Sequence, residues 1–177
     1  MALITLTTDY GTRDYYAAAV KGALYSAYPQ AQVVDISHEI APFDLHQAAF
    51  VLKQAYVHFP PGTIHLIGVG AEWSPEQDQV VVVMDGHYFL GADNGLFALL
   101  FPDRKPECIV SIDISQAGDH PTFPLKDLYV RVAAHLARGG KPQVVGREKT
   151  HWKESSMFQP MVAENKSHIR GMVVYID

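Results

Sequence analysis

The sequence predicts one α/β domain in which a mostly parallel sheet is covered by helices on both faces. Short apolar, β-branched runs alternate with segments whose apolar residues recur at helical spacing. This order is typical of parallel strands joined by helical crossovers. The chain has 177 residues, of which 48% are hydrophobic and 19% charged. Such a composition indicates a folded domain of ordinary size and excludes a disordered chain.

The first unit is a strand followed by a helix. Residues 3–8 (LITLTT) are apolar and β-branched, which predicts a buried strand. Gly11 permits a tight turn after it. Thr12 is then a candidate cap for a helix whose apolar face begins at Tyr15 and includes Leu24.

This arrangement places Asp9 at the carboxyl end of the first strand, where open α/β sheets bind their ligands. A carboxylate there can accept hydrogen bonds from two neighbouring hydroxyls, such as those of a ribose. The alternative is that Asp9 and Asp14 only cap a turn and the start of the helix.

The later elements are predicted from the same two patterns, short apolar runs for strands and apolar residues at helical spacing for helices. We expect strands over residues 32–36, 63–69, 79–84, 87–90, 108–112 and 170–176, and helices over residues 45–56, 96–101 and 127–138. Asp85-Gly86 between two strands is a strong hairpin signal. Asn94-Gly95 is expected to open the short helix, and Gly139-Gly140 to close the last one.

Composition also excludes several classes of function. A net charge of −5 without runs of like charge gives no surface for unspecific binding of nucleic acid. No apolar stretch is long enough to span a bilayer, so we expect a soluble, cytoplasmic protein without membrane contact. The single cysteine, Cys108, begins an apolar run and is expected to be a structural thiol.

The nine histidines do not indicate a metal site. None forms a His-x-x-x-His pair or a cluster with cysteine. We therefore expect no metal and no cofactor. His38 follows a strand end and is a candidate to face the cleft.

Five segments stand out in order along the chain: ITLTTDYGTRDYYAAAVKG at residues 4–22, VDISHEIAPFDLHQA at 34–48, FPPGTIH at 59–65, HYFLGADNGL at 87–96 and AAHLARG at 133–139. Taken together, they resemble the S-adenosylmethionine hydroxide adenosyltransferase family, which includes the fluorinases and chlorinases.

The resemblance implies a larger N-terminal α/β domain, here residues 1–170, that binds a nucleoside. Residues 171–177 would then begin a linker or strand toward a smaller β-rich domain that is missing from this chain. It also implies a homotrimer of the full-length protein, with adenosine or S-adenosylmethionine bound between neighbouring subunits as ligand or substrate.

Five residues match ligand-binding positions of the family. By resemblance, Asp9 takes the ribose hydroxyls and Asp14 contacts the amino-acid end, although Asp14 also suits the first turn of any helix. Phe43 would pack beside ribose and adenine, and Phe123 near the purine, unless both are ordinary core residues. Asn94 matches a family turn, but Asn-Gly is a turn pair in any protein.

This sequence departs from the catalytic pattern of the hydrolase branch of the family. The resemblance implies an Asp-Arg-His set, but no aspartate stands near Gly70 and no arginine occurs between residues 65 and 85. Pro124 follows Phe123 where the histidine is expected. Glu72 and Lys126 are the nearest substitutes, although we favour an exposed loop charge and a helix-start charge for them.

Two functions therefore stay open, beside a third reading in which the α/β fold serves only as an oligomer scaffold and binds no nucleoside. The first is an S-adenosylmethionine hydrolase in which water attacks C5′ and releases methionine and adenosine. The alternative is a family member that binds S-adenosylmethionine or adenosine without turnover, which the missing catalytic set favours.

Overall fold

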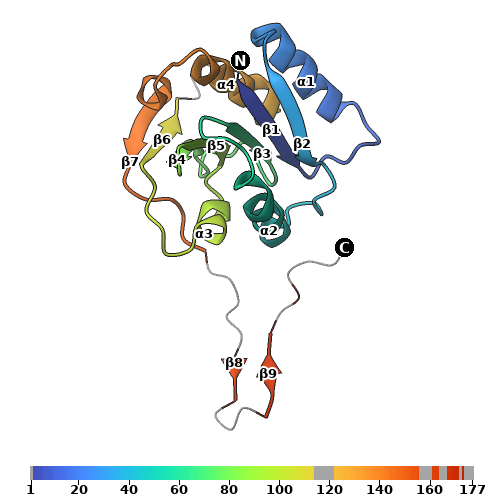
Figure 1. Cartoon of the computed structure of the whole chain (residues 1–177), viewed down its shortest axis with the longest axis vertical. Helices are drawn as coiled ribbons and strands as arrows, with labels where there is room; N and C mark the ends of the chain where they lie inside the picture. Colours follow the sequence, from blue (N-terminus) through green and yellow to red (C-terminus); the bar gives the residue numbers. More distant parts are fainter. Residues whose placement is uncertain (1, 114–121, 156–160, 164–166, 172, 174–177) are drawn as a thin grey trace.

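A seven-stranded sheet forms the centre of the computed structural model, which describes residues 2–113, 122–155, 161–163, 167–171 and 173 (Figure 1). The order of strands across the sheet is β2-β1-β3-β5-β4-β6-β7. Their bounds are β1 Leu3–Thr8, β2 Gln32–Ser37, β3 Ile64–Gly68, β4 Gln79–Met84, β5 His87–Ala92, β6 Cys108–Ile112 and β7 Gly146–Lys149.

Strand direction divides the sheet into two parts. The pairs β1–β2, β1–β3 and β3–β5 are parallel, whereas β4–β5, β4–β6 and β6–β7 are antiparallel. Five strands therefore point in one direction, and β4 and β7 in the other. The predicted α/β class with a mostly parallel sheet is confirmed.

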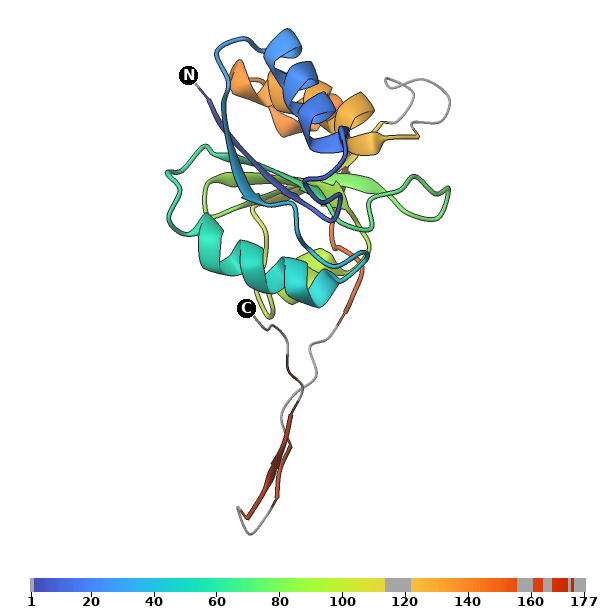
Figure 2. The same cartoon turned by 90° about the vertical axis from the view of Figure 1, so that its right-hand side faces the viewer.

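Helices cover both faces of the sheet, as expected (Figure 2). On one face lie α1 (Tyr16–Ala27) and α4 (Val130–Ala137), which continues a π-helical turn at Leu125–Tyr129. On the other lie α2 (Leu45–Tyr56) and α3 (Leu96–Leu100).

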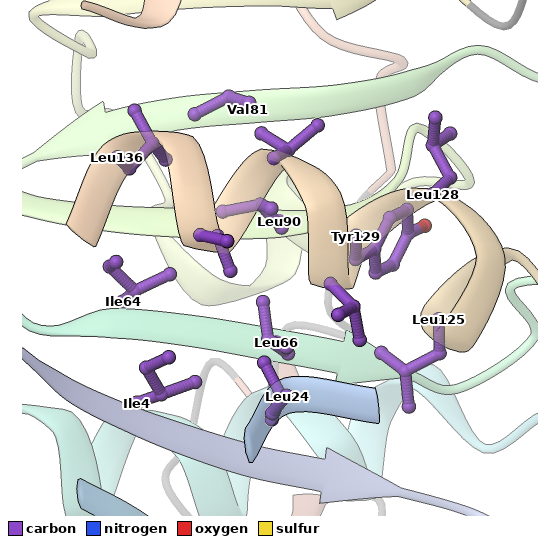
Figure 3. Close-up of a cluster of buried hydrophobic side chains, with 14 of the residues drawn as sticks. Ile4, Leu24, Ile64, Leu66, Val81, Leu90, Leu125, Leu128, Tyr129 and Leu136 are labelled. Atoms are coloured by element: carbon purple, nitrogen blue, oxygen red, sulfur yellow. The ribbon is translucent and has the colours of Figure 1, made fainter. Parts of the chain in front are cut away.

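Alternate strand residues supply two separate cores. Ile4 and Leu66 pack with Leu24 of α1 and with the helix that carries Leu128, as Figure 3 shows. Ile67 and its neighbours pack instead against α2 and α3. Because side chains of a strand alternate between faces, one short apolar run can serve both cores.

Several local predictions are confirmed. α2 has the expected bounds, and its Asp44 side chain accepts a 2.9 Å hydrogen bond from Gln47 N as an N-cap. Asp85 and Gly86 join β4 to β5 with φ of 53° and 74°, the left-handed backbone of a tight hairpin turn. Gly95 precedes α3 with φ of 103°.

Other local predictions were wrong. Thr12 does not cap α1; its hydroxyl donates to Glu39 Oε1 at 2.8 Å, and the helix begins only at Tyr16. The last helix starts earlier than residue 127, with the π-helical turn. The polar strand β7 was not predicted, because GREK carries no apolar pattern.

The end of the described chain forms a small separate sheet. β8 (Met161–Val162) pairs with β9 (Ile169–Arg170), and both lie apart from the domain in Figure 1. The strand expected over residues 170–176 thus starts at Ile169 and ends at Arg170, while residues 172 and 174–177 lie outside the described part. The domain boundary at residue 170 stays a prediction. None of the helices among the described residues is long and apolar enough to cross a membrane.

Candidate functional site

A cavity of about 810 Å³ lies beyond the carboxyl ends of β1 and β3. It is lined by the segment after β1, the loop before α2, the loop after β3 and the chain that enters the π-helical turn. Five residues singled out from the sequence meet in this lining: Asp9, Phe43, Glu72, Phe123 and Lys126. The cavity therefore occupies the sheet edge where open α/β folds bind ligands.

The Asp9 carboxylate joins two of these loops. Its Oδ2 accepts the backbone N–H of Phe43 at 3.0 Å and that of Gly70 at 3.3 Å. Its Oδ1 accepts no hydrogen bond from the described residues. One oxygen thus fixes the walls of the cavity, and the second is available to hydroxyls of a ligand.

Phe43 is held in an unusual backbone conformation at the rim. Its φ is 63°, in the left-handed region that bulky residues rarely adopt, and its side chain is 63% exposed. It therefore does not belong to the core. Strained residues of this kind cluster at binding sites, where the surrounding structure imposes them.

Asn94 lies behind the cavity, outside its lining. Its Nδ2 donates to the carbonyls of Val69 and Gly70 at 3.1 Å each, and its Oδ1 accepts the N–H of Leu96 at 3.2 Å. Asn94 thus ties the loop after β3 to the start of α3. A direct contact with the ligand stays a prediction.

Gly70 occupies the place of the aspartate that the family resemblance led us to expect. Its φ is +54°, and a Cβ there would lie 3.3 Å from Asn94 Nδ2. The close approach and the left-handed backbone both favour glycine. The loop after β3 is therefore built without a carboxylate at this point.

Asp14 also lies outside the cavity lining. Its Oδ1 accepts the N–H of the next residue, Tyr15, at 2.7 Å just before α1. This contact agrees with a role at the helix start, and a contact with the amino-acid end of a ligand stays a prediction.

The two candidate catalytic charges share the cavity but do not pair with each other. Lys126 Nζ lies 2.7 Å from Asp127 Oδ1 and 5.8 Å from the centre of the Phe123 ring. Glu72 is exposed, and its side chain forms no ion pair within the described residues. Lys126 is thus already held by a carboxylate, whereas Glu72 is not.

Three tyrosines that we did not single out from the sequence complete the lining: Tyr10, Tyr15 and Tyr16. The Tyr10 ring centre lies 5.4 Å from that of Phe123 and 5.8 Å from that of Tyr16. Burial, together with the charges of Asp9 and Glu72, raises the pKa of Tyr10 well above its ordinary range, so the phenol stays protonated. The three tyrosines follow closely after the end of β1 in the sequence, and this clustering is the signal from which their place in the lining could have been predicted.

A network that runs from buried Thr8 and His38 to the exposed Asp35 supports the loop that carries Asp9. Thr8 Oγ1 lies 2.8 Å from His38 Nδ1, and His38 Nε2 lies 3.1 Å from Asp35 Oδ1. The carbonyl of His38 also accepts the N–H of Gly11 at 2.7 Å. A hydroxyl, an imidazole and a carboxylate in a row resemble a nucleophilic triad, but Thr8 is fully buried. His38, a candidate to face the cleft, therefore positions the loop and does not line the cavity.

No group of three or more histidine, cysteine, aspartate or glutamate side chains in the described part of the chain is arranged to hold a metal ion. Cys108 is half-buried, and burial, followed by the charge of Glu148, raises its thiol pKa. A raised pKa disfavours the reactive thiolate.

Comparison with known proteins links the chain to one family. The family model of the SAM hydroxide adenosyltransferase N-terminal domain matches residues 4–146. A Methanocaldococcus jannaschii protein named (R)-S-adenosyl-L-methionine hydrolase is 34% identical over 139 residues, covering 76% of this chain and 52% of the relative. A Thermus thermophilus protein of the same name is 30% identical over 165 residues, covering 84% and 62%. The chain thus spans between half and two thirds of these relatives.

Solved structures share the fold. The crystal structure of an uncharacterized conserved protein from Thermotoga maritima matches 92% of this chain and 63% of its own, with a TM-score of 0.81 and 28% identity. A conserved hypothetical protein from Thermus thermophilus matches with a TM-score of 0.73 and 30% identity, covering 89% of this chain and 63% of its own.

Proposed function

Because this chain belongs to the family of SAM hydroxide adenosyltransferase N-terminal domains, we propose that it binds S-adenosylmethionine beside Asp9 and hydrolyses it. The oxygen of a water molecule attacks C5′ of the ribose and forms the new C–O bond. The bond between C5′ and sulfur breaks, and its electron pair stays on methionine. The water loses one proton, so the products are adenosine, methionine and a proton.

One observation carries this proposal: Asp9 presents a carboxylate oxygen without a partner among the described residues, at the edge of a cavity that also contains Phe43 and Phe123. A vicinal diol can donate two hydrogen bonds to such a carboxylate. The two exposed or half-exposed rings supply apolar surface for the nucleoside. A cavity of about 810 Å³ is in the range of small-molecule sites.

The sulfonium is a good leaving group, so alignment and desolvation carry much of the rate. For the water, we assign Glu72 as the acceptor of its proton. Asp9 is bound by two backbone N–H groups and Asp127 pairs with Lys126, which leaves Glu72 as the unpaired carboxylate among the described residues of the lining. A positioned base contributes roughly two to four powers of ten in rate.

The second candidate function is binding without turnover. Gly70 in place of the expected aspartate and the lack of an arginine between residues 65 and 85 favour it. The homotrimer that the resemblance implies stays a prediction as well.

A reaction in ¹⁸O-labelled water decides between these functions. The purified chain is incubated with S-adenosylmethionine, and products are separated by chromatography and weighed by mass spectrometry. Hydrolysis at C5′ gives adenosine that carries the label and an equal amount of methionine. Tight binding of S-adenosylmethionine without adenosine establishes the second function. Absence of both binding and product overturns both.

A further inference from the structure

Three aromatic rings stand together in the cavity wall. The ring centre of Tyr16 lies 5.8 Å from that of Tyr10 and 5.6 Å from that of Phe123, and Tyr10 lies 5.4 Å from Phe123. The interplanar angles are 50°, 84° and 72°, so the rings meet mostly edge to face. Tyr15 stacks on Tyr16 with centres 4.5 Å apart. All four side chains line the cavity.

The charge around these rings favours a cation. Among the described residues, the lining contains the carboxylates Asp9, Glu72 and Asp127 and the single ammonium of Lys126. The formal charge of this described part of the lining is therefore −2. Both Asp9 and Glu72 act on the Tyr10 phenol, which places their negative potential at the rings.

A positive charge already rests against one ring of the cluster. Lys126 Nζ lies 5.8 Å from the centre of the Phe123 ring while Asp127 holds it at 2.7 Å. A cation within about 6 Å of a ring centre is attracted by the negative face of the ring. The surroundings of the Phe123 ring are thus compatible with positive charge. The Tyr16 ring is 39% exposed, and no cation lies over it among the described residues.

We propose that Tyr10, Tyr16 and Phe123 form a subsite for an onium cation, a positively charged sulfur or nitrogen centre. If the proposed function holds, this cation is the sulfonium of S-adenosylmethionine, and the subsite distinguishes it from the neutral thioether of S-adenosylhomocysteine. Aromatic rings attract such cations because the face of each ring is negative, and a neutral thioether gains no such attraction.

The test measures how much more tightly the protein binds a charged ligand than a neutral one, with two ligands that it cannot hydrolyse in the proposed reaction. Sinefungin carries an ammonium group where S-adenosylmethionine has its sulfonium, and S-adenosylhomocysteine is neutral there. Calorimetry with the whole chain gives the ratio of their affinities. We expect the charged ligand to bind about 5- to 30-fold tighter than the neutral one in the unsubstituted protein.

Variants of Tyr16 assign this preference to the ring. Tyr16→Phe keeps the aromatic face and should keep the preference, whereas Tyr16→Leu should bring the ratio close to one. Tyr25→Leu changes an exposed tyrosine of the same helix outside the cavity lining and should change neither affinity. Adenosine affinity should stay the same in Tyr16→Leu, which excludes collapse of the site. An unchanged preference in Tyr16→Leu overturns the proposal.

A probe without a nucleoside separates this inference from the proposed function. Trimethylsulfonium is titrated against the protein by NMR, with neutral tert-butanol as its isostere. Saturable shifts with trimethylsulfonium that vanish in Tyr16→Leu support the subsite even if no nucleoside binds, in which case only the proposed function fails. No saturable shift, or equal shifts with tert-butanol, overturns the subsite.

Discussion

The backbone N–H of Phe43 donates a 3.0 Å hydrogen bond to Asp9 Oδ2, across 34 residues of sequence. This bond joins the end of β1 to the loop before α2 and places an exposed aromatic ring beside the carboxylate. It also explains why Phe43 adopts a left-handed backbone, because its N–H must point toward the strand end. The hydrogen bond to Asp9 thus holds the arrangement of the cavity, and the backbone of Phe43 is strained as a consequence.

Asp9→Asn should weaken adenosine binding by about 10- to 100-fold, because the charged acceptor for the ribose hydroxyls is lost. The amide oxygen can still accept from Phe43 and Gly70, so the thermal stability should change little. Calorimetric titration measures the affinity. Asp103→Asn, at an exposed carboxylate outside the cavity lining, is the matched control. Adenosine binding at the unsubstituted affinity in Asp9→Asn would show that the site assignment is wrong.

Phe43→Gly should give a more stable protein than Phe43→Ala, by about 1 kcal/mol, because only glycine adopts positive φ without strain. Denaturant unfolding of both variants measures the difference. Both should lose nucleoside affinity equally, since both lose the ring. Equal stability of the two variants would contradict strain at this position.

Glu72→Gln should lower the rate of adenosine formation by at least about 100-fold while the affinity for S-adenosylmethionine stays nearly constant. The amide keeps the shape of the side chain but cannot accept the proton of water. Glu76→Gln removes another exposed carboxylate of the same loop and should leave the rate unchanged. Full activity of Glu72→Gln would remove Glu72 from the mechanism.

Asn94→Ala should destabilise the fold by about 1–3 kcal/mol, because the carbonyl of Val69 loses this donor and that of Gly70 keeps only the one from Gln77 Nε2. Asn94→Asp keeps the acceptor for Leu96 N but also lacks the donor, so it should lose similar stability. Thermal unfolding measures both. A large loss of ligand affinity with no loss of stability would instead favour a direct contact with the ligand.

Acid should destabilise the protein through a buried pair of histidines, His65 of β3 and His87 of β5. His65 Nδ1 lies 2.7 Å from Thr5 Oγ1, and His65 Nε2 lies 3.2 Å from His87 Nδ1. Burial, followed by the charge of His87, lowers the pKa of His65 from 6.5 to about 3. Between these values the unfolded chain binds a proton that the folded chain does not, so stability falls as the pH falls.

From pH 7 to pH 5 the loss expected for His65 alone is about 2 kcal/mol. Denaturant unfolding across this range measures it. His65→Gln removes the titrating group and should flatten the dependence on pH, whereas a change at the exposed His168 should not. A pH-independent free energy of unfolding would refute a neutral buried His65.

The sequence by itself determined the order of strands and helices wherever one face of an element is buried. The run at residues 3–8, the helix at residues 45–56 and the Asp85-Gly86 hairpin were predicted because local periodicity records burial along a single element. The position of Asp9 at a strand end followed from the same pattern.

Only the tertiary structure decided what Asp9 contacts and which residues surround it. Phe43 and Gly70, 34 and 61 residues away, reach its carboxylate through loops whose paths no periodicity describes. Tyr10 and Tyr16 line the cavity only because α1 and the π-helical turn pack on the same face of the sheet. Strand β7 likewise forms because the exposed edge of β6 offers it unpaired backbone groups. A local sequence pattern indicates which residues are buried. A site depends instead on which separate segments of the chain are brought together by packing.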